Sequence, residues 1–195
     1  NNATDLSFNS ISVDGDMSTN DTVIGLSNGM GGDALITTKS KALSTISNSI
    51  NGIFYDLASL IVKDAEGGTK FCKITVHGAS SQSSAKLVAR KISNSLLFKT
   101  ALFGSDSNWG RIIAAIGSSD VSYINQNIID ISIGNYLIVK NGIEYNKSKI
   151  ADKLMKKKEV EININLNSGK HSSYMLTNDI GINYETVSSK VDKVS

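Results

Sequence analysis

Proline is absent from the 195 residues, and cysteine occurs only once, at Cys72. A single cysteine excludes a disulfide within the chain, which suits a reducing compartment such as the cytoplasm. No run approaches the roughly 20 apolar residues that a membrane helix requires, and the first residues form neither a basic nor an apolar targeting segment. These absences predict a soluble, cytoplasmic protein. The lack of proline reflects a composition rich in Asn, Lys, Ile and Ser, and no function is inferred from it.

Charge of either sign is also sparse. The formal net charge is +2, and the lysines are dispersed except for the run 156–158, which is typical of a solvated helix end. Because a nucleic-acid-binding surface requires a denser basic patch, we expect neither nucleic acid nor membrane as a partner. Apolar residues make up 40% of the chain. This content and length predict one domain over residues 1–195, with 117–120 as a candidate sub-boundary.

The spacing of apolar residues predicts an α+β chain. Spacings of three and four indicate an amphipathic helix over residues 38–62, whose apolar positions are Leu43, Ile46, Ile50, Phe54, Leu57 and Ile61. Similar patterns predict helices over 83–98, 109–116 and 148–157. Alternation and apolar runs predict strands over 8–13, 69–78, 128–139 and 160–166, a short element over 22–28, and a turn at 141–142.

Cys72 is the first candidate for chemistry. It belongs to the apolar face of the expected strand 69–78, whereas His77 falls on the opposite face of the same strand. A cysteine nucleophile needs a base within reach, so we assign Cys72 to the core.

A second candidate is the polar cluster that contains Asp14, Asp16 and Asp21. Clustered carboxylates can hold a hard cation, but their order does not fit an EF-hand loop. Asx turns and caps at a sharp corner are the favoured interpretation. Trp109 and Arg111 could stack on or bind a carboxylate, but a tryptophan near a helix start is more often part of the core.

Glu66 is the third candidate, because it lies between an expected helix and an expected strand in the segment 64–70. Gly67 and Gly68 would let the backbone approach a ligand, and Lys70 could supply a counter-charge. A carboxylate in this place could bind an amino group. The alternative is a helix end with a glycine stop and a solvated acid.

Four segments occur in a recognisable order and spacing: Ser7–Thr22, Asp64–Phe71, Lys99–Ile112 and Val139–Gly142. Together they resemble the β chain of the glutamate N-acetyltransferase/ornithine acetyltransferase family of arginine biosynthesis. The resemblance implies an α+β fold with mixed sheets layered against helices. It also implies a two-chain enzyme, made from one precursor that cuts itself before a threonine. That threonine would take the acetyl group from N-acetylornithine, and glutamate would then accept it in a ping-pong transfer.

The resemblance also implies site residues. The family's substrate-contacting glutamate corresponds to Glu66. Near the end of the chain Asp179 and Tyr184 match the family pattern, whereas Ser188 replaces a substrate-binding asparagine and Lys193 replaces a threonine. We therefore expect Glu66, Ser188 and Lys193 to face the substrate. A lysine adds charge and a serine has shorter reach than asparagine, so the amino-acid substrate could differ from the family's.

Other parts of the expected enzyme lie outside the chain. We expect the nucleophilic threonine upstream, since Thr4 is too close to Ser7, and we assign no catalytic residue here. A second alignment puts Asn183 in the asparagine position, at the cost of a deletion and of the match at Tyr184. The expected partners are the α chain of the same precursor, further αβ units and amino-acid substrates. No metal or cofactor is expected, although bifunctional members use acetyl-coenzyme A as donor.

Two other functions stay open at this point. The first is a hydrolase, such as an aminopeptidase or amidase, built on the same self-cleaving architecture and discharging the acyl-enzyme to water. The second is a non-catalytic paralogue, which the replacements at Ser188 and Lys193 suggest.

Overall fold

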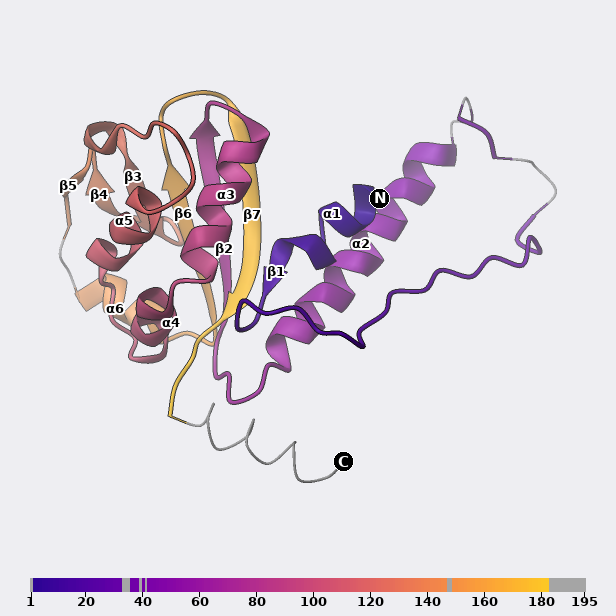
Figure 1. The fold of residues 1–195 in the computed structure, drawn as a ribbon, viewed down its shortest axis with the longest axis horizontal. Helices are drawn as coiled ribbons and strands as arrows, with labels where there is room; N and C mark the ends of the chain where they lie inside the picture. The colour runs from indigo at the N-terminus through magenta and orange to yellow at the C-terminus, as the bar shows by residue number, and fades with distance from the viewer. Residues whose placement is uncertain (1, 33–35, 39, 41, 147–148, 183–195) are drawn as a thin grey trace.

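The computed structural model describes residues 2–32, 36–38, 40, 42–146 and 149–182. Its described strands form one mixed sheet of seven strands in the order β1-β7-β2-β6-β3-β4-β5 (Figure 1). Pairs β1–β7 and β2–β6 are parallel, and the other neighbours are antiparallel. The strands are β1 (Ile11–Ser12), β2 (Phe71–Ala79), β3 (Asp130–Ile133), β4 (Tyr136–Lys140), β5 (Ile143–Glu144), β6 (Glu159–Asn165) and β7 (His171–Asn178).

Helices pack on both faces of this sheet, so the α+β class with a mixed sheet is confirmed. The α-helices are α1 (Asn2–Asp5), α2 (Ala42–Lys63), α3 (Gln82–Ser93), α4 (Leu96–Phe103), α5 (Trp109–Gly117) and α6 (Lys149–Met155). Two short 3₁₀ turns are η1 (Phe8–Ser10) and η2 (Gln126–Ile128). None of the described helices combines the length and apolarity needed to cross a membrane.

The main core lies between the sheet and helices α3 to α5. Alternation along β2 buries Cys72, Ile74 and Val76 on the face that α3 covers, where Val88 and Ile92 are fully buried. Each buried isoleucine or valine of this kind stabilises the fold by about 1.5–3 kcal/mol relative to an exposed one. The strands expected over 69–78 and 160–166 are confirmed as β2 and β6.

The helix expected over 38–62 is confirmed as α2, which spans Ala42–Lys63, but α2 packs differently from the usual amphipathic helix. It buries Ala58 and Val62, and Tyr55 stacks edge-on against Tyr174 of β7 at a centroid distance of 6.0 Å. Most of the large apolar side chains of α2 do not pack on the sheet and are partly exposed to solvent. A stripe at spacings of three and four remains between 36% and 59% exposed, and this apolar stripe comprises Leu43, Ile46, Ile50, Ile53, Leu57 and Leu60.

Two expected elements are each split in two by a local turn. The helix expected over 83–98 ends at Asn94, and the Ser95 hydroxyl then accepts the Phe98 amide and starts α4. The strand expected over 128–139 is the hairpin β3–β4, because Gly134 adopts φ +55° between the strands. The turn at 141–142 is confirmed: Asn141 and Gly142 have φ of +51° and +72° between β4 and β5.

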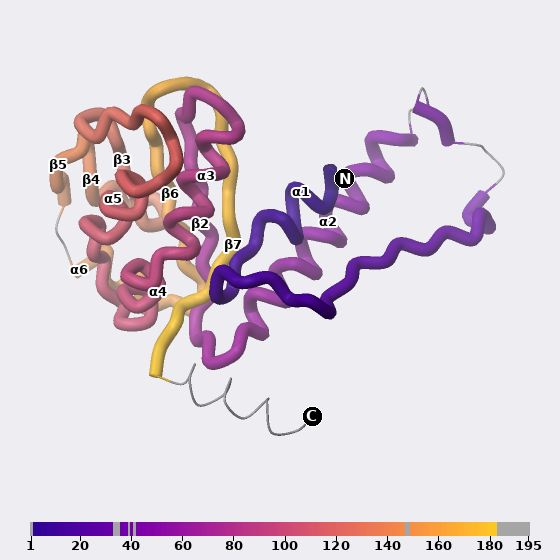
Figure 2. Tube along the Cα trace, viewed as in Figure 1, coloured from indigo at the N-terminus to yellow at the C-terminus, as the bar shows by residue number. Residues whose placement is uncertain are grey.

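The prediction for the first forty residues was the least accurate. The expected strand 8–13 is the 3₁₀ turn η1 followed by only two paired residues in β1. Residues 22–28 form neither helix nor strand and are exposed. Their trace runs away from the sheet toward the N-terminal end of α2 (Figure 2). The sheet combines strands from both sides of 117–120, and the single-domain assignment stays a prediction.

Candidate functional site

Glu66 lies in the short connection between α2 and β2. The connection turns at Gly67, which has φ +67°, and the Gly68 amide donates to the Ala65 carbonyl. The Glu66 side chain is exposed. Gly68 packs closely, since a Cβ atom there would lie 3.2 Å from the Ala65 carbonyl oxygen and 3.3 Å from Nδ2 of Asn178. The glycines therefore bring this loop against the end of β7, and Glu66 points to the outside of it.

Asp179, the residue after β7, holds the same loop. Its carboxylate accepts hydrogen bonds from the Thr69 amide at 2.7 Å, the Thr69 hydroxyl at 2.5 Å and the Lys70 amide at 2.8 Å. The Asp179 side chain is buried. A buried carboxylate that accepts three hydrogen bonds is a rigid anchor, because each bond to a charged acceptor is worth about 1.5–3 kcal/mol. These three hydrogen bonds, which we call the Asp179 brace, fix the backbone of Thr69 and Lys70, next to Glu66.

Lys70 does not supply the expected counter-charge to Glu66. Its ammonium donates instead to the Leu102 carbonyl at 2.5 Å and to the Ser105 hydroxyl at 2.7 Å, at the C-terminal end of α4. Partial burial lowers the pKa of Lys70, and the nearby Asp179 carboxylate opposes that shift. The side chain thus links the loop to α4, where the carbonyl groups favour a cation.

Lys99 of α4 is a buried cation that the sequence analysis did not select. Its ammonium contacts the Val13 carbonyl, the Thr177 hydroxyl and two oxygens of Asn178. Burial lowers the pKa of Lys99 to about 8, and the neighbouring Cys72, Asp14 and Asp179 oppose that shift. A lysine inside the otherwise apolar run of α4 was the available signal, but its partners lie far away in the sequence.

The aspartates after β1 form turns, as the favoured interpretation predicted. The Asp14 carboxylate accepts the Asp16 amide at 2.9 Å, and the Ser18 hydroxyl accepts the amides of Asn20 and Asp21 at 3.2 Å each. Such bonds are those of Asx and Ser/Thr turns. Among the described residues, no group of three or more His, Cys, Asp or Glu side chains is placed to hold a metal ion.

Comparison with known proteins decides the family. The ArgJ family model matches residues 1–191 of the chain. The chain belongs to the ArgJ family. The resemblance carried by the four sequence segments is therefore confirmed.

Individual relatives of this ArgJ-family chain show how much of the family it represents. The arginine biosynthesis bifunctional protein ArgJ, mitochondrial, of Schizosaccharomyces japonicus is 40% identical over 93% of this chain and 43% of the relative. The glutamate N-acetyltransferase of Methanocaldococcus jannaschii is 37% identical over 95% of this chain and 47% of the relative. The chain thus spans less than half the length of these curated relatives.

A solved structure confirms the fold of this ArgJ-family chain. The crystal structure of arginine biosynthesis bifunctional protein argJ from Bacillus halodurans superposes with a TM-score of 0.92 at 34% identity, covering 97% of this chain and 89% of that chain. A score this high means that the two chains share one fold.

Three further ArgJ-family positions lie outside the described residues. Ser188 and Lys193, expected to face the substrate, are two of them, and Tyr184 of the matching pattern is the third. Asn183 of the second alignment lies outside as well. Their roles stay predictions. Asp179, four residues before this region, is the last residue of the pattern whose contacts are described.

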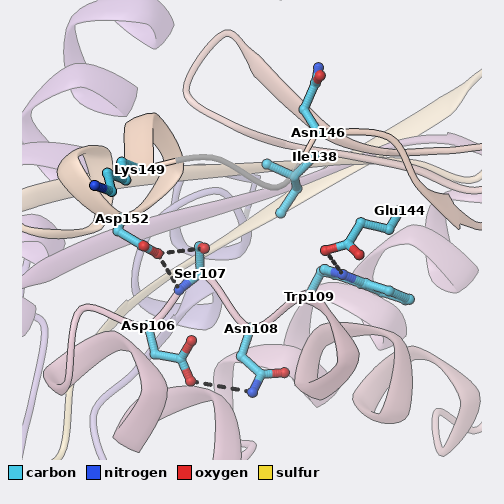
Figure 3. Close-up of a pocket in the computed structure, with 9 residues that line it drawn as sticks. All are labelled: Asp106, Ser107, Asn108, Trp109, Ile138, Glu144, Asn146, Lys149 and Asp152. Carbon is cyan, nitrogen blue, oxygen red and sulfur yellow. Dashed lines mark hydrogen bonds between the residues drawn. The ribbon is translucent and has the colours of Figure 1, made fainter.

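Trp109 packs against the core of this ArgJ-family chain, as the core interpretation predicted, and Arg111 contacts a neighbouring helix. Trp109 is half-buried against the core, and its indole Nε1 donates to the Glu144 carboxylate at 3.4 Å across a cavity of about 460 Å³ (Figure 3). Ser107 on the same rim donates to Asp152 of α6 at 2.7 Å. The Arg111 guanidinium donates to the Leu97 carbonyl at 2.7 Å. These bonds tie α5 to β5 and α4, and the connection before α5 to α6.

Cys72 is a core residue, and His77 is exposed on the other face of β2, as predicted. Burial raises the pKa of the Cys72 thiol well above its usual range.

We expect dithionitrobenzoate to label Cys72 in the folded chain at pH 8 about 100-fold more slowly than it labels free cysteine, because only the thiolate of an opened state reacts. N-acetylcysteine and the chain unfolded in guanidinium chloride serve as controls. Rapid labelling of the folded chain would contradict this assignment.

Proposed function

We propose that this chain is the β-chain part of an acetyltransferase that moves the acetyl group of N-acetylornithine to glutamate. The observation that carries the proposal is membership of the ArgJ family, of which one relative is named glutamate N-acetyltransferase. The nucleophile in this proposal is a threonine outside the chain, freed when the precursor cuts itself. It would take the acetyl group as an ester, release ornithine, and pass the group to the glutamate amine.

The role that we propose for Glu66 is to bind the amino group of the substrate. Its carboxylate is exposed, and the loop that carries it is anchored by the three hydrogen bonds to Asp179. A carboxylate on a rigid support pairs with an ammonium ion at low entropic cost, which favours amino-acid substrates over neutral ones. This geometry supports an amino-acid-binding site at the junction of α2 and β2.

The partner that we propose is the remaining half of the ArgJ polypeptide, the α chain, which we expect to cover the apolar stripe of α2. Soluble chains rarely leave six large apolar side chains exposed along one helix. The stripe repeats at spacings of three and four, as in helices that pack lengthwise against a partner. The segment after β1 also exposes apolar side chains, since Met17 and Leu26 are 93% and 94% exposed. Further αβ units are expected to assemble on such pairs.

Donor, cofactor and compartment complete the proposal. We expect the reaction to need no metal or prosthetic group, with acetyl-coenzyme A as a second acetyl donor if the protein is bifunctional. We place the protein in the cytoplasm, although several fungal relatives carry the word mitochondrial in their names.

The test of the proposed function is an assay of the full-length polypeptide that contains this chain. Acetyl transfer from N-acetylornithine to glutamate is measured, and mass spectrometry looks for an acetylated N-terminal threonine after self-cleavage. Transfer with that adduct supports the proposal. Release of acetate without glutamate-dependent turnover points to the hydrolase, and a precursor that neither cleaves nor transfers points to the non-catalytic paralogue.

Substitution of Glu66 tests the assigned residue. We expect Glu66→Gln to raise KM for the amino acid at least tenfold, because it removes the charge that pairs with the substrate ammonium, which is worth about 1.5–3 kcal/mol. The change leaves the fold intact, since the side chain is exposed. The matched control is Asp64→Asn, which neutralises another exposed carboxylate of the same connection. Equal kinetics for the two variants would remove Glu66 from the site.

A further inference from the structure

Lys99 lies in the middle of α4, among Leu97, Phe98, Ala101 and Leu102, and its side chain is only 1% exposed. Lysine is almost never buried to this extent unless its charge has partners, because desolvation of an ammonium ion costs several kcal/mol. An aliphatic residue would fill the same space without that cost. The presence of the charge therefore calls for an explanation in its contacts.

The contacts of the Lys99 ammonium join two segments that are far apart in the sequence. Nζ lies 2.6 Å from the Val13 carbonyl, directly before the turn at Asp14. It lies 2.7 Å from the Thr177 hydroxyl, and 3.0 Å and 3.1 Å from the backbone and side-chain oxygens of Asn178. The three N–H donors of the Lys99 ammonium thus have four oxygen acceptors within hydrogen-bonding distance.

The same network reaches the loop of Glu66. Asn178 Nδ2 donates to the Asp179 carbonyl at 2.8 Å and lies against Gly68. The Asp179 carboxylate then holds Thr69 and Lys70. Continuous hydrogen bonds therefore connect the turn after β1, the end of β7 and the Glu66 loop, with Lys99 at the centre.

We propose that Lys99 is a positioning residue for the amino-acid site, whose ammonium fixes the turn after β1 and the end of β7 in register with the Glu66 loop. The amino-acid site rests on the function proposed above. The hydrogen bonds of the Lys99 ammonium to Val13, Thr177 and Asn178, which we call the Lys99 clamp, are a property of this chain. Neutral hydroxyl or amide donors could satisfy one or two of these oxygens, but only an ammonium offers three strong donors from a single point. At pH 7 the side chain keeps its proton, since its pKa is about 8.

The experiment compares Lys99→Met with the native residue in the full-length ArgJ polypeptide. Methionine keeps the length and removes the charge. We expect amides of residues 13–17 and 66–70 to exchange with deuterium at least tenfold faster. We also expect KM for the amino acid to rise at least tenfold while kcat falls less than threefold, because the displaced groups bind substrate and the nucleophile lies outside this chain.

Phe98→Leu is the matched control on the same helix. Phe98 is equally buried and lies in the apolar core, so its replacement destabilises the protein without touching the ammonium network. We expect its KM to stay within twofold of the native value. A folded Lys99→Met protein with native KM and native exchange in both segments would overturn the proposal.

The proposal stays testable if Lys99→Met does not fold or if the native polypeptide shows no acetyl transfer. If Lys99→Met does not fold, Thr177→Val decides, because it removes one acceptor and keeps the shape; a native KM and native exchange would then overturn the proposal. If the native polypeptide shows no acetyl transfer, the proposed function fails. Faster exchange confined to the two segments in Lys99→Met would still support the clamp.

Discussion

Replacement of Asp179 by alanine is expected to lower the free energy of unfolding by about 3 kcal/mol. The change leaves the Thr69 and Lys70 amides without their acceptor, and each of these partly buried hydrogen bonds to a charged acceptor is worth about 1.5–3 kcal/mol. It also removes a negative charge that favours the protonated forms of Lys70 and Lys99. Urea denaturation at about pH 7 measures the change from the shift of the midpoint at constant slope. Amino-acid use by the full-length polypeptide should fall with it.

A milder variant and a control test the effect expected of Asp179→Ala. Asp179→Asn keeps one carbonyl oxygen as acceptor, so we expect roughly half of the destabilisation. Asp64→Asn removes an exposed carboxylate near the same loop and should change stability by less than about 0.5 kcal/mol. A loss of under about 1 kcal/mol in Asp179→Ala would show that the brace contributes little to the fold.

Charged residues in the apolar stripe of α2 are expected to weaken the proposed association with the remaining half of the polypeptide at least about tenfold. The double variant Ile53→Asp, Leu57→Asp replaces two side chains that are 56% and 47% exposed in this chain. Each loses about 1.5–3 kcal/mol of apolar burial in the complex, and burying an aspartate costs more. Recovery of the untagged half with a tagged chain, after co-expression, should fall at least about tenfold, since every 1.4 kcal/mol is tenfold in affinity.

The control adds the same charge on the other side of α2, in Thr45→Asp, Asn48→Asp. Both positions are exposed and lie off the stripe. We expect this variant to keep its partner, and both double variants to unfold at the native urea midpoint when the chain is tested alone. Equal recovery with both variants would mean that the partner docks elsewhere.

Helix α2 shows that apolar periodicity locates a helix but does not identify what covers its apolar face. Spacings of three and four depend only on the helical repeat, so the pattern located the helix to within a few residues at each end. The same pattern does not say what covers the apolar face. In this chain the sheet takes the face of Ala58 and Val62, and the stripe beside it is left exposed.

The two split elements were missed for a different reason. The stripe that ends α3 continues in phase into α4, so periodicity joined them, although Asn94 and Ser95 are typical capping residues. Between β3 and β4 the apolar run hid a hairpin turn at Gly134. Both breaks are local, and closer attention to caps and glycines would have found them.

Sequence alone determined the family, the α+β class, the core position of Cys72 and the loop that carries Glu66, because motif identity, spacing and the periods of helix and strand are local properties of the chain. Tertiary structure alone decided that Lys99 contacts Val13 and Asn178, that Asp179 anchors Thr69, and that Lys70 faces α4. These contacts join residues separated by some thirty to more than a hundred positions. Which partners a buried charge finds depends on how the sheet orders its strands, and no local pattern in the sequence encodes that order.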